Sequence, residues 1–344
     1  MTPSLSAKEL AKKKLAVLVR DFEELENTAG LKGQSEAQAR IWINKALEAF
    51  GWNIANPAEV ILEYSIKGRA ARRIRTEGFH HNRPDYALLV NGKRILYIDA
   101  KRFDIFIQEH STSAFQARTY GWSAGMSLSY VMDFQELAVY DCRFKPDPQD
   151  NAKVARLAYF HYKEYIPRFD ELWEYFGHEA IQNGSLERLS PQDKLPRGAM
   201  TLDTDFEANL SLWRKELARS VLRYGKIRDA KLLSAVAQRI LDRIIFIRFC
   251  EEIGLEEYGT LKAIVLDEDG FWPAFMKETE TRWRGVYDGV LFPHSEEDDP
   301  SGVETVINDI WIKGNVFKTI CRGLYMPSPY CFEVIPIDLL GGIY

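Results

Sequence analysis

The chain has 344 residues, a formal net charge of −5, 46% hydrophobic residues and a mean hydropathy of −0.28. This composition excludes a disordered, collagen-like or fibrous protein, and the length fits about two domains of roughly 100–200 residues each. No run approaches the roughly 18 apolar residues of a membrane helix. No signal peptide is recognised, and the four cysteines lack CxxC spacing. We therefore expect a cytoplasmic protein with no membrane partner, disulfide framework or zinc site.

The first part of the chain predicts helices and strands in an order typical of an α/β layer. Apolar periodicity separates helices from strands, and Asn91-Gly92 is a strong hairpin signal between two of the strands. Predicted helices cover 8–27, 35–50 and 105–122, and predicted strands cover 58–66, 84–90, 94–101, 127–133 and 136–141. This order predicts an α/β fold with a mixed sheet flanked by helices.

The pattern changes near residue 145, after which helical periodicity dominates. The clearest helices are predicted over 205–224 and 229–253, whereas 267–299 is an irregular stretch with ten acidic and three basic residues. We predict an α/β domain over 1–155 and a mostly helical domain over 156–344. Charged residues of the 229–253 helix are candidates for a contact between domains; they are Arg239, Asp242, Arg243 and Arg248.

Two carboxylates and a lysine gather around the predicted hairpin. Asp99 and Lys101 are two residues apart on one strand, so they share a face, and Asp85 opens the neighbouring strand. A strict two-residue turn pairs Val90 with Lys93 and puts Asp85 on the wrong face. We predict a three-residue turn, or an equivalent bulge, because only then does Asp85 face Asp99.

These residue types suit the hydrolysis of a phosphodiester. Carboxylate oxygens are the ligands that Mg²⁺ prefers, and the metal polarises a phosphoryl oxygen and activates water. Lys101 can orient that water or stabilise developing negative charge. Glu36, at the start of its helix, adds a candidate carboxylate. Gln116 and Tyr120 share a helix face and are candidates to hold a phosphate or a water.

A basic run over 67–75 precedes the hairpin. It is either a solvated loop or a contact with the DNA backbone beside the site, a contact that salt weakens. The candidate DNA-binding residues are Arg69, Arg72, Arg73, Arg75, Lys93 and Arg102. The pair His80-His81 lacks partner spacing for a metal site.

The motifs together resemble the PD-(D/E)xK nuclease superfamily. The pattern is Glu36, Pro84-Asp85, Asp99-Ala100-Lys101 and Gln116-x-x-x-Tyr120, whose last element resembles the RecB-like branch and the nuclease of type I restriction motor subunits. The wider sequence resembles the N-terminal part of single-chain type IIG restriction-modification enzymes. The passages that carry this likeness are AFQARTYGWSAG, VMDFQELAVYDCRF, AVAQRILDRIIFIRFCEEIGL and IPIDLLGGIY.

The resemblance implies a Mg²⁺-dependent endonuclease of a bacterial or archaeal phage-defence system that cuts double-stranded DNA. Asp85, Asp99, the Ala100 carbonyl and Glu36 would bind Mg²⁺, or Mn²⁺ in its place. A helical connector would lead to methyltransferase and target-recognition domains, but neither an Asn-Pro-Pro-Tyr motif nor an S-adenosylmethionine loop is present. S-adenosylmethionine would therefore act only through a methyltransferase outside this sequence.

Two alternatives remain open. One is another nuclease setting, in repair or in a type I motor subunit, although no Walker A motif is present. The other is a non-catalytic DNA-binding or assembly module that keeps the fold. A single nuclease site also suggests a transient dimer on DNA for cutting both strands.

Overall fold

The structure is a computed structural model of the whole chain, which divides into two compact units at Leu202 and Asp203. Each unit is described by itself. The described residues are 5–28, 30–62, 84–191, 196–225, 227, 229–267, 270–287, 289–295, 298–312, 314–325, 327–332 and 334–335.

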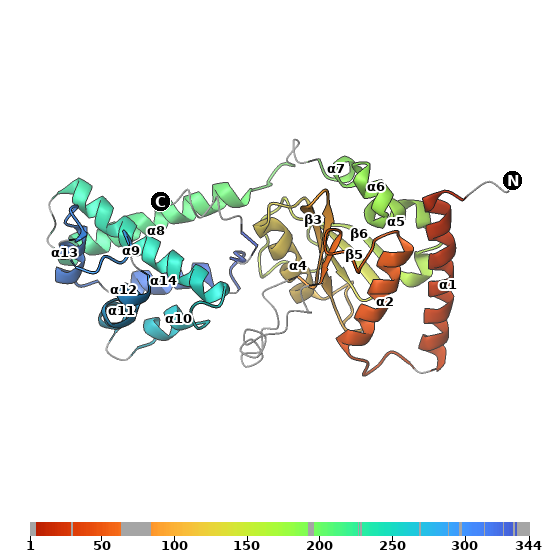
Figure 1. Cartoon of the computed structure of the whole chain (residues 1–344), viewed down its shortest axis with the longest axis horizontal. Helices are drawn as coiled ribbons and strands as arrows, with labels where there is room; N and C mark the ends of the chain where they lie inside the picture. The colour runs from red at the N-terminus through yellow and green to blue at the C-terminus, as the bar shows by residue number, and fades with distance from the viewer. Residues whose placement is uncertain are drawn as a thin grey trace. The chain divides into compact units, whose positions relative to one another are not determined.

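A six-stranded mixed sheet forms the centre of the first unit (Figure 1). Its strands lie side by side in chain order; only β3 and β4 are parallel, and all other neighbours are antiparallel. The bounds are β1 Val60–Leu62, β2 Tyr86–Val90, β3 Lys93–Ala100, β4 Leu128–Met132, β5 Glu136–Asp141 and β6 Arg156–His161. The predicted α/β class with a mixed sheet is confirmed.

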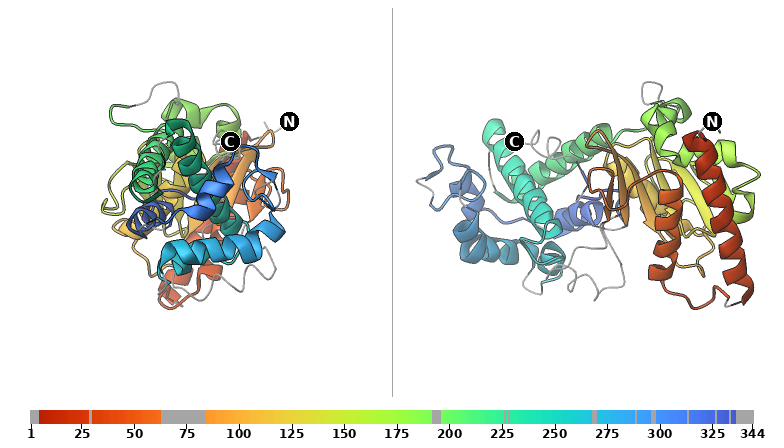
Figure 2. Two further views of the ribbon diagram at one scale, coloured as in Figure 1. Left: turned by 90° about the vertical axis from the view of Figure 1, so that its left-hand side faces the viewer. Right: turned by 45° about the vertical axis from the view of Figure 1, so that its right-hand side comes forward.

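Helices cover both faces of this sheet. Figure 1 shows α1 (Ala7–Thr28) and α2 (Glu36–Ala49) on one side and α4 (Ser111–Ser123) on the other, and α1 and α2 run side by side in Figure 2. Alternation along the strands explains the layers. Tyr130 and Met132 point into the core beneath α1 and α2, whereas Val131 packs in a smaller core beneath α4.

The hairpin between β2 and β3 corrects the predicted turn. Val90 pairs with Lys93 across a two-residue turn, in which Asn91 and Gly92 have φ of 52° and 75°. Positive φ at both central residues is typical of a type I′ turn. The predicted three-residue turn is therefore wrong, but the alternative of a bulge is confirmed.

The bulge follows one residue later in the ladder. Leu89 pairs with Arg94, whereas Leu88 pairs with Leu96, so one residue of β3 has no partner of its own. From there the register runs to Tyr86 opposite Ile98. The side chains of β2 and β3 are thereby shifted into the facing arrangement that a strict hairpin would not produce.

The first unit extends beyond the predicted boundary at 155. Strand β6 and the following short helices pack on the same core as α1 and α2, because Phe160, Phe169 and Phe176 are fully buried there. These helices are η3 Tyr162–Glu164, α5 Phe169–Phe176, α6 His178–Gln182 and α7 Ser185–Leu189. The predicted domains 1–155 and 156–344 therefore become units 1–202 and 203–344, since the aromatic residues after 155 belong to the sheet's core.

The regular elements described in the second unit are helices, apart from one isolated β-bridge between Gly289 and Phe292. Its long helices α8 (Leu202–Gly225) and α9 (Ala230–Glu252) confirm the predicted helices over 205–224 and 229–253. The other helices are α10 Thr260–Val265, α11 Phe271–Glu278, the π-helical η4 Thr279–Trp283, α12 Arg284–Val286, α13 Val303–Asp309 and α14 Gly314–Leu324. The stretch 267–299 is thus not irregular throughout, because buried Phe271, Phe275 and Trp283 anchor helices within it.

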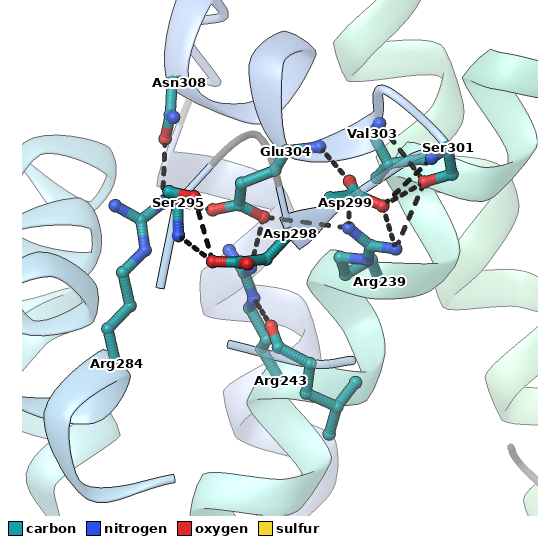
Figure 3. Close-up of polar contacts among 11 residues, drawn as sticks. Arg239, Arg243, Arg284, Ser295, Asp298, Asp299, Ser301, Val303, Glu304 and Asn308 are labelled. Atoms are coloured by element: carbon teal, nitrogen blue, oxygen red, sulfur yellow. Dashed lines mark hydrogen bonds and ion pairs between the residues drawn. The ribbon is translucent and has the colours of Figure 1, made fainter. Parts of the chain in front are cut away.

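A buried charge network holds α9 to α13 (Figure 3). Arg243 donates to Glu304 at 2.5 Å, and both side chains are fully buried. Arg239 donates to Asp299 at 2.6 Å, and Arg284 also binds Glu304. Arg239 and Arg243 were candidates for a contact between domains, but the partners Asp299 and Glu304 lie inside the second unit.

Three further observations complete the fold. Helix α4 begins at Ser111 rather than 105, because His110 caps its N-terminus while the residues before it form turns.

All four cysteines are buried and free of disulfides. Among the described residues, no helix is long and apolar enough to cross a membrane.

Candidate active site

The bulge brings Asp85 and Asp99 together at the end of the sheet. Because Tyr86 pairs with Ile98, one further step of the antiparallel register sets Asp85 opposite Asp99. Both carboxylates are buried, with 6% and 3% of their surface exposed. Asp85 Oδ2 accepts a hydrogen bond of 2.7 Å from the backbone N–H of Ala100, which fixes it against β3.

Arg40 of α2 links Glu36 to Asp85. Its guanidinium donates to Glu36 Oε1 at 2.5 Å and also to Asp85 Oδ1. Helix α2 is held over the start of β2 by the Tyr86 hydroxyl, which donates to Asn44 Oδ1 at 2.9 Å. Arg40 therefore bridges the Glu36 carboxylate to Asp85.

Lys101 links Asp99 to helix α4. Its Nζ lies 2.6 Å from Asp99 Oδ2 and donates to Gln116 Oε1 at 3.1 Å. Gln116 Nε2 in turn donates to the Tyr120 hydroxyl at 2.7 Å. The six candidate catalytic residues therefore lie in two sets of polar contacts, one of Glu36, Arg40 and Asp85 and one of Asp99, Lys101, Gln116 and Tyr120. The two sets meet where the register sets Asp85 opposite Asp99.

A close approach of α4 to the sheet brings Gln116 and Tyr120 to this position. Ser129 Oγ of β4 donates to the Ala117 carbonyl at 2.6 Å. Gly121 lies so close to the sheet that an added Cβ would sit 2.4 Å from Cys142 Sγ. Only glycine fits at this contact.

Burial and charge shift the pKa values of the three central groups. Burial raises the pKa of Asp99 to about 6, against the opposing effect of the Lys101 charge. Burial also raises the pKa of Asp85, although Arg40 opposes it. For Lys101, burial lowers the pKa, but the facing carboxylates, Asp99 first, outweigh it and raise the pKa overall. Lys101 is therefore a cation here and acts as a hydrogen-bond donor.

The donors at the site are oxygen atoms suited to a hard cation. Two converging buried carboxylates and the nearby Ala100 carbonyl belong to the class of ligand that Mg²⁺ prefers. Within the described ranges, no group of three or more His, Cys, Asp or Glu side chains is arranged to hold a metal ion. The Glu36 carboxylate is bound by Arg40, so in this arrangement it does not form a metal-binding group with the two aspartates.

The candidate DNA-binding residues fall into two groups. Lys93 is exposed at the hairpin turn, and Arg102 follows Lys101, where it donates to Asp104 at 3.0 Å. Both side chains are exposed. The other candidates lie outside the described residues, as does the pair His80-His81; they are Arg69, Arg72, Arg73 and Arg75.

Sequence reasoning missed two residues near the site. Arg40 is four residues after Glu36, a spacing that predicts an ion pair on one helix face but not its second partner, Asp85. His110 caps α4, and its pKa is lowered by burial and then by the charge of Lys101. No short motif marks either residue, because both contacts depend on how separate elements pack.

The chain is similar in sequence to a restriction enzyme. The chain is 27% identical over 321 residues to the type II restriction enzyme and methyltransferase RM.Eco57I of Escherichia coli. The match covers 90% of this chain but only 30% of that enzyme's length. No family model and no solved structure matches the chain. The likeness therefore extends over both units, and the chain is similar to less than a third of a restriction-modification enzyme.

Proposed function

We propose that the chain is the nuclease end of a type IIG restriction-modification enzyme, and that it hydrolyses phosphodiester bonds of double-stranded DNA with Mg²⁺. The observation that carries the proposal is the convergence of Asp85, Asp99 and Lys101 through the β3 bulge. Two buried carboxylates beside a lysine fit a PD-(D/E)xK nuclease core. The similarity to a restriction enzyme and methyltransferase supports the same reading.

The proposed roles follow from the geometry. Asp85 and Asp99, with the Ala100 carbonyl, would hold Mg²⁺, or Mn²⁺ in its place, and Glu36 would contribute a further carboxylate. Bound Mg²⁺ polarises a phosphoryl oxygen and lowers the pKa of water. The Lys101 ammonium, held by Gln116, orients the attacking water and stabilises charge that develops on the phosphate.

Gln116 and Tyr120 have a positioning role in this proposal. Gln116 accepts a hydrogen bond from the Lys101 ammonium, and Tyr120 holds the Gln116 side chain from the same helix, α4. Cleavage of the bond to the 3′ oxygen would leave a 5′-phosphate and a 3′-hydroxyl. Lys93 and Arg102, with the basic run 67–75, would contact DNA phosphates without reading sequence.

The remaining parts of the enzyme are proposed by analogy. A methyltransferase that uses S-adenosylmethionine and a target-recognition domain would accompany this chain. The name of the E. coli relative likewise combines a restriction enzyme with a methyltransferase. One nuclease site cuts one strand, so a double-strand break requires two copies that meet on DNA. A single-turnover cleavage rate independent of protein concentration would contradict this dimer.

The test of the proposed function compares the chain with a Lys101→Ala variant on supercoiled plasmid. The chain should nick the plasmid when Mg²⁺ is present and should not nick it when EDTA removes the metal. Lys101→Ala should lose nicking while it keeps DNA binding, measured by fluorescence anisotropy with Ca²⁺. Absence of nicking by both, with binding retained, would favour a non-catalytic DNA-binding module.

A further inference from the structure

One segment of the second unit is strongly basic, although the chain as a whole is acidic. Residues 211–231 hold seven basic and two acidic residues, whereas the 344 residues together have a net charge of −5. Most of this segment belongs to α8, which Figure 1 shows as a long helix along one side of the second unit. Lys and Arg that cluster along one helix are the electrostatic signature of a nucleic-acid contact.

Three of these cations form a basic ridge on the outermost face of α8. They are exposed and four residues apart: Lys215, Arg219 and Arg223. The buried side chains Trp213, Leu217 and Val221 repeat with the same spacing, two residues earlier. Two residues correspond to about 200° around an α-helix, so the two rows lie on opposite sides. The apolar row anchors α8 in its unit, and the basic ridge therefore faces solvent.

No carboxylate pairs with the basic ridge in the part of the chain that the structure describes. Exposed arginines of the first unit do have such partners; Arg188, for example, lies 3.0 Å from Glu174. The Arg223 guanidinium lies 5.9 Å from the centre of the Tyr224 ring, a contact that leaves its charge uncompensated. The positive charge of the ridge is therefore available to an external anion.

The length of the basic ridge suits the backbone of a nucleic acid. Lys215 lies eight residues before Arg223, which at about 1.5 Å per residue is roughly 12 Å along the helix. One strand of a DNA duplex carries a phosphate about every 3.4 Å of the duplex axis, so the ridge extends over roughly three to four phosphates. The ridge and the backbone thus match in sign and in length.

We propose that the basic ridge binds backbone phosphates of the duplex DNA substrate, as a second DNA contact that the helical unit contributes. The inference rests on the proposed function, which identifies the polyanion as DNA. Contacts of Lys and Arg with phosphates release counterions and are independent of sequence. The ridge would therefore add affinity and hold the DNA along α8 without reading a recognition sequence.

The test measures the affinity of the 344-residue chain for a DNA duplex at 50 to 200 mM salt, in Ca²⁺ to prevent cleavage. The ridge variant combines Lys215→Gln, Arg219→Gln and Arg223→Gln. Each lost phosphate contact reduces the slope of log affinity against log salt by about 0.9, so the wild-type chain should lose about 40-fold more affinity than the ridge variant over this range. Lys215→Arg keeps the charge and should keep the wild-type slope.

A matched variant removes three cations of the first unit whose side chains are 59–74% exposed. It combines Arg20→Gln, Lys163→Gln and Arg188→Gln. It changes the net charge by the same amount but should keep the wild-type slope, because carboxylates already pair with these cations. A wild-type slope in the ridge variant, or an equal fall in both variants, would overturn the proposal.

Two further measurements separate this contact from helix stability and from catalysis. Basic residues near the end of a helix also complement its dipole. A lower melting temperature of the ridge variant with an unchanged salt slope would show only that role and overturn the contact. At low salt and saturating DNA, the ridge variant should nick plasmid at the wild-type rate. A chain that binds DNA with a slope set by the ridge but never nicks would contradict the proposed catalysis and leave this contact standing.

Discussion

The Lys101 ammonium lies 2.6 Å from Oδ2 of Asp99, directly after strand β3, in which a bulge between Arg94 and Leu96 shifts the register against β2. This ion pair joins the two halves of the site. Asp85, Arg40 and Glu36 lie on one side of it, and Gln116 and Tyr120 on the other.

Mg²⁺ binding should depend on pH through Asp99. Burial raises the pKa of this carboxyl to about 6, so protons compete with the metal below that pH. Affinity for Mg²⁺, measured by calorimetry, should rise as the pH is raised from 5 to 7 and then level. Asp99→Asn should bind weakly at every pH. A wild-type affinity equal at pH 5 and 7 would exclude Asp99 as a ligand.

Arg40 should stabilise the first unit by neutralising Asp85. The two side chains are 14% and 7% exposed, so removal of the guanidinium leaves a carboxylate buried with one partner fewer. Arg40→Ala should lower the free energy of unfolding by about 3–5 kcal/mol, the range for breaking a buried pair. Arg20→Ala is the matched control, because the Arg20 side chain is 74% exposed. Equal urea midpoints for the two variants would show that Arg40 and Asp85 do not form the buried pair.

Gly121 should set the distance between α4 and the sheet. An alanine there would place its Cβ 2.4 Å from Cys142 Sγ, so Gly121→Ala should destabilise the chain by about 1–3 kcal/mol and displace Gln116 and Tyr120. Gly285→Ala, also in a helix but with open space around it, should be neutral or stabilising. Thermal melting and plasmid nicking measure the two effects. Normal stability and nicking in Gly121→Ala would contradict this packing.

Glu304 should be essential to the second unit. Its carboxylate is fully buried and binds both Arg243 and Arg284. Glu304→Gln should lower stability by about 3–5 kcal/mol because buried arginines lose their counter-charge. Glu207→Gln, at an exposed position of α8, should have little effect. A denaturation curve of Glu304→Gln that overlays the wild-type curve would show that the network contributes nothing.

Much of the fold could be predicted because its signals are local. Apolar periodicity identified the long helices and most strands to within a few residues, and Asn91-Gly92 marked the hairpin. The domain boundary was missed because the aromatic residues after 155 show their role only in packing against the distant helices α1 and α2. The start of α4 was missed because the anchoring of 102–110 depends on Glu136, from another strand.

The candidate site was predicted in part. Alternation along β3 places Asp99 and Lys101 on one face, and helical spacing pairs Gln116 with Tyr120. The position of Asp85 required a choice between turn and bulge, which depends on how one extra residue is accommodated in the ladder. Arg40 could not be predicted as the partner of Asp85, because that contact joins residues 45 positions apart. The roles of all six residues remain predictions.

The most direct test is the rate of Mg²⁺-dependent plasmid nicking in Asp85→Asn and Asp99→Asn. Both changes keep the shape of the side chain and remove a charge that a metal needs, so both variants should lose nicking while they still bind DNA. Asp170→Asn is the control, because that side chain is 81% exposed on α5, and it should nick at the wild-type rate. Wild-type nicking by either site variant would contradict the account that these two carboxylates form a nuclease centre.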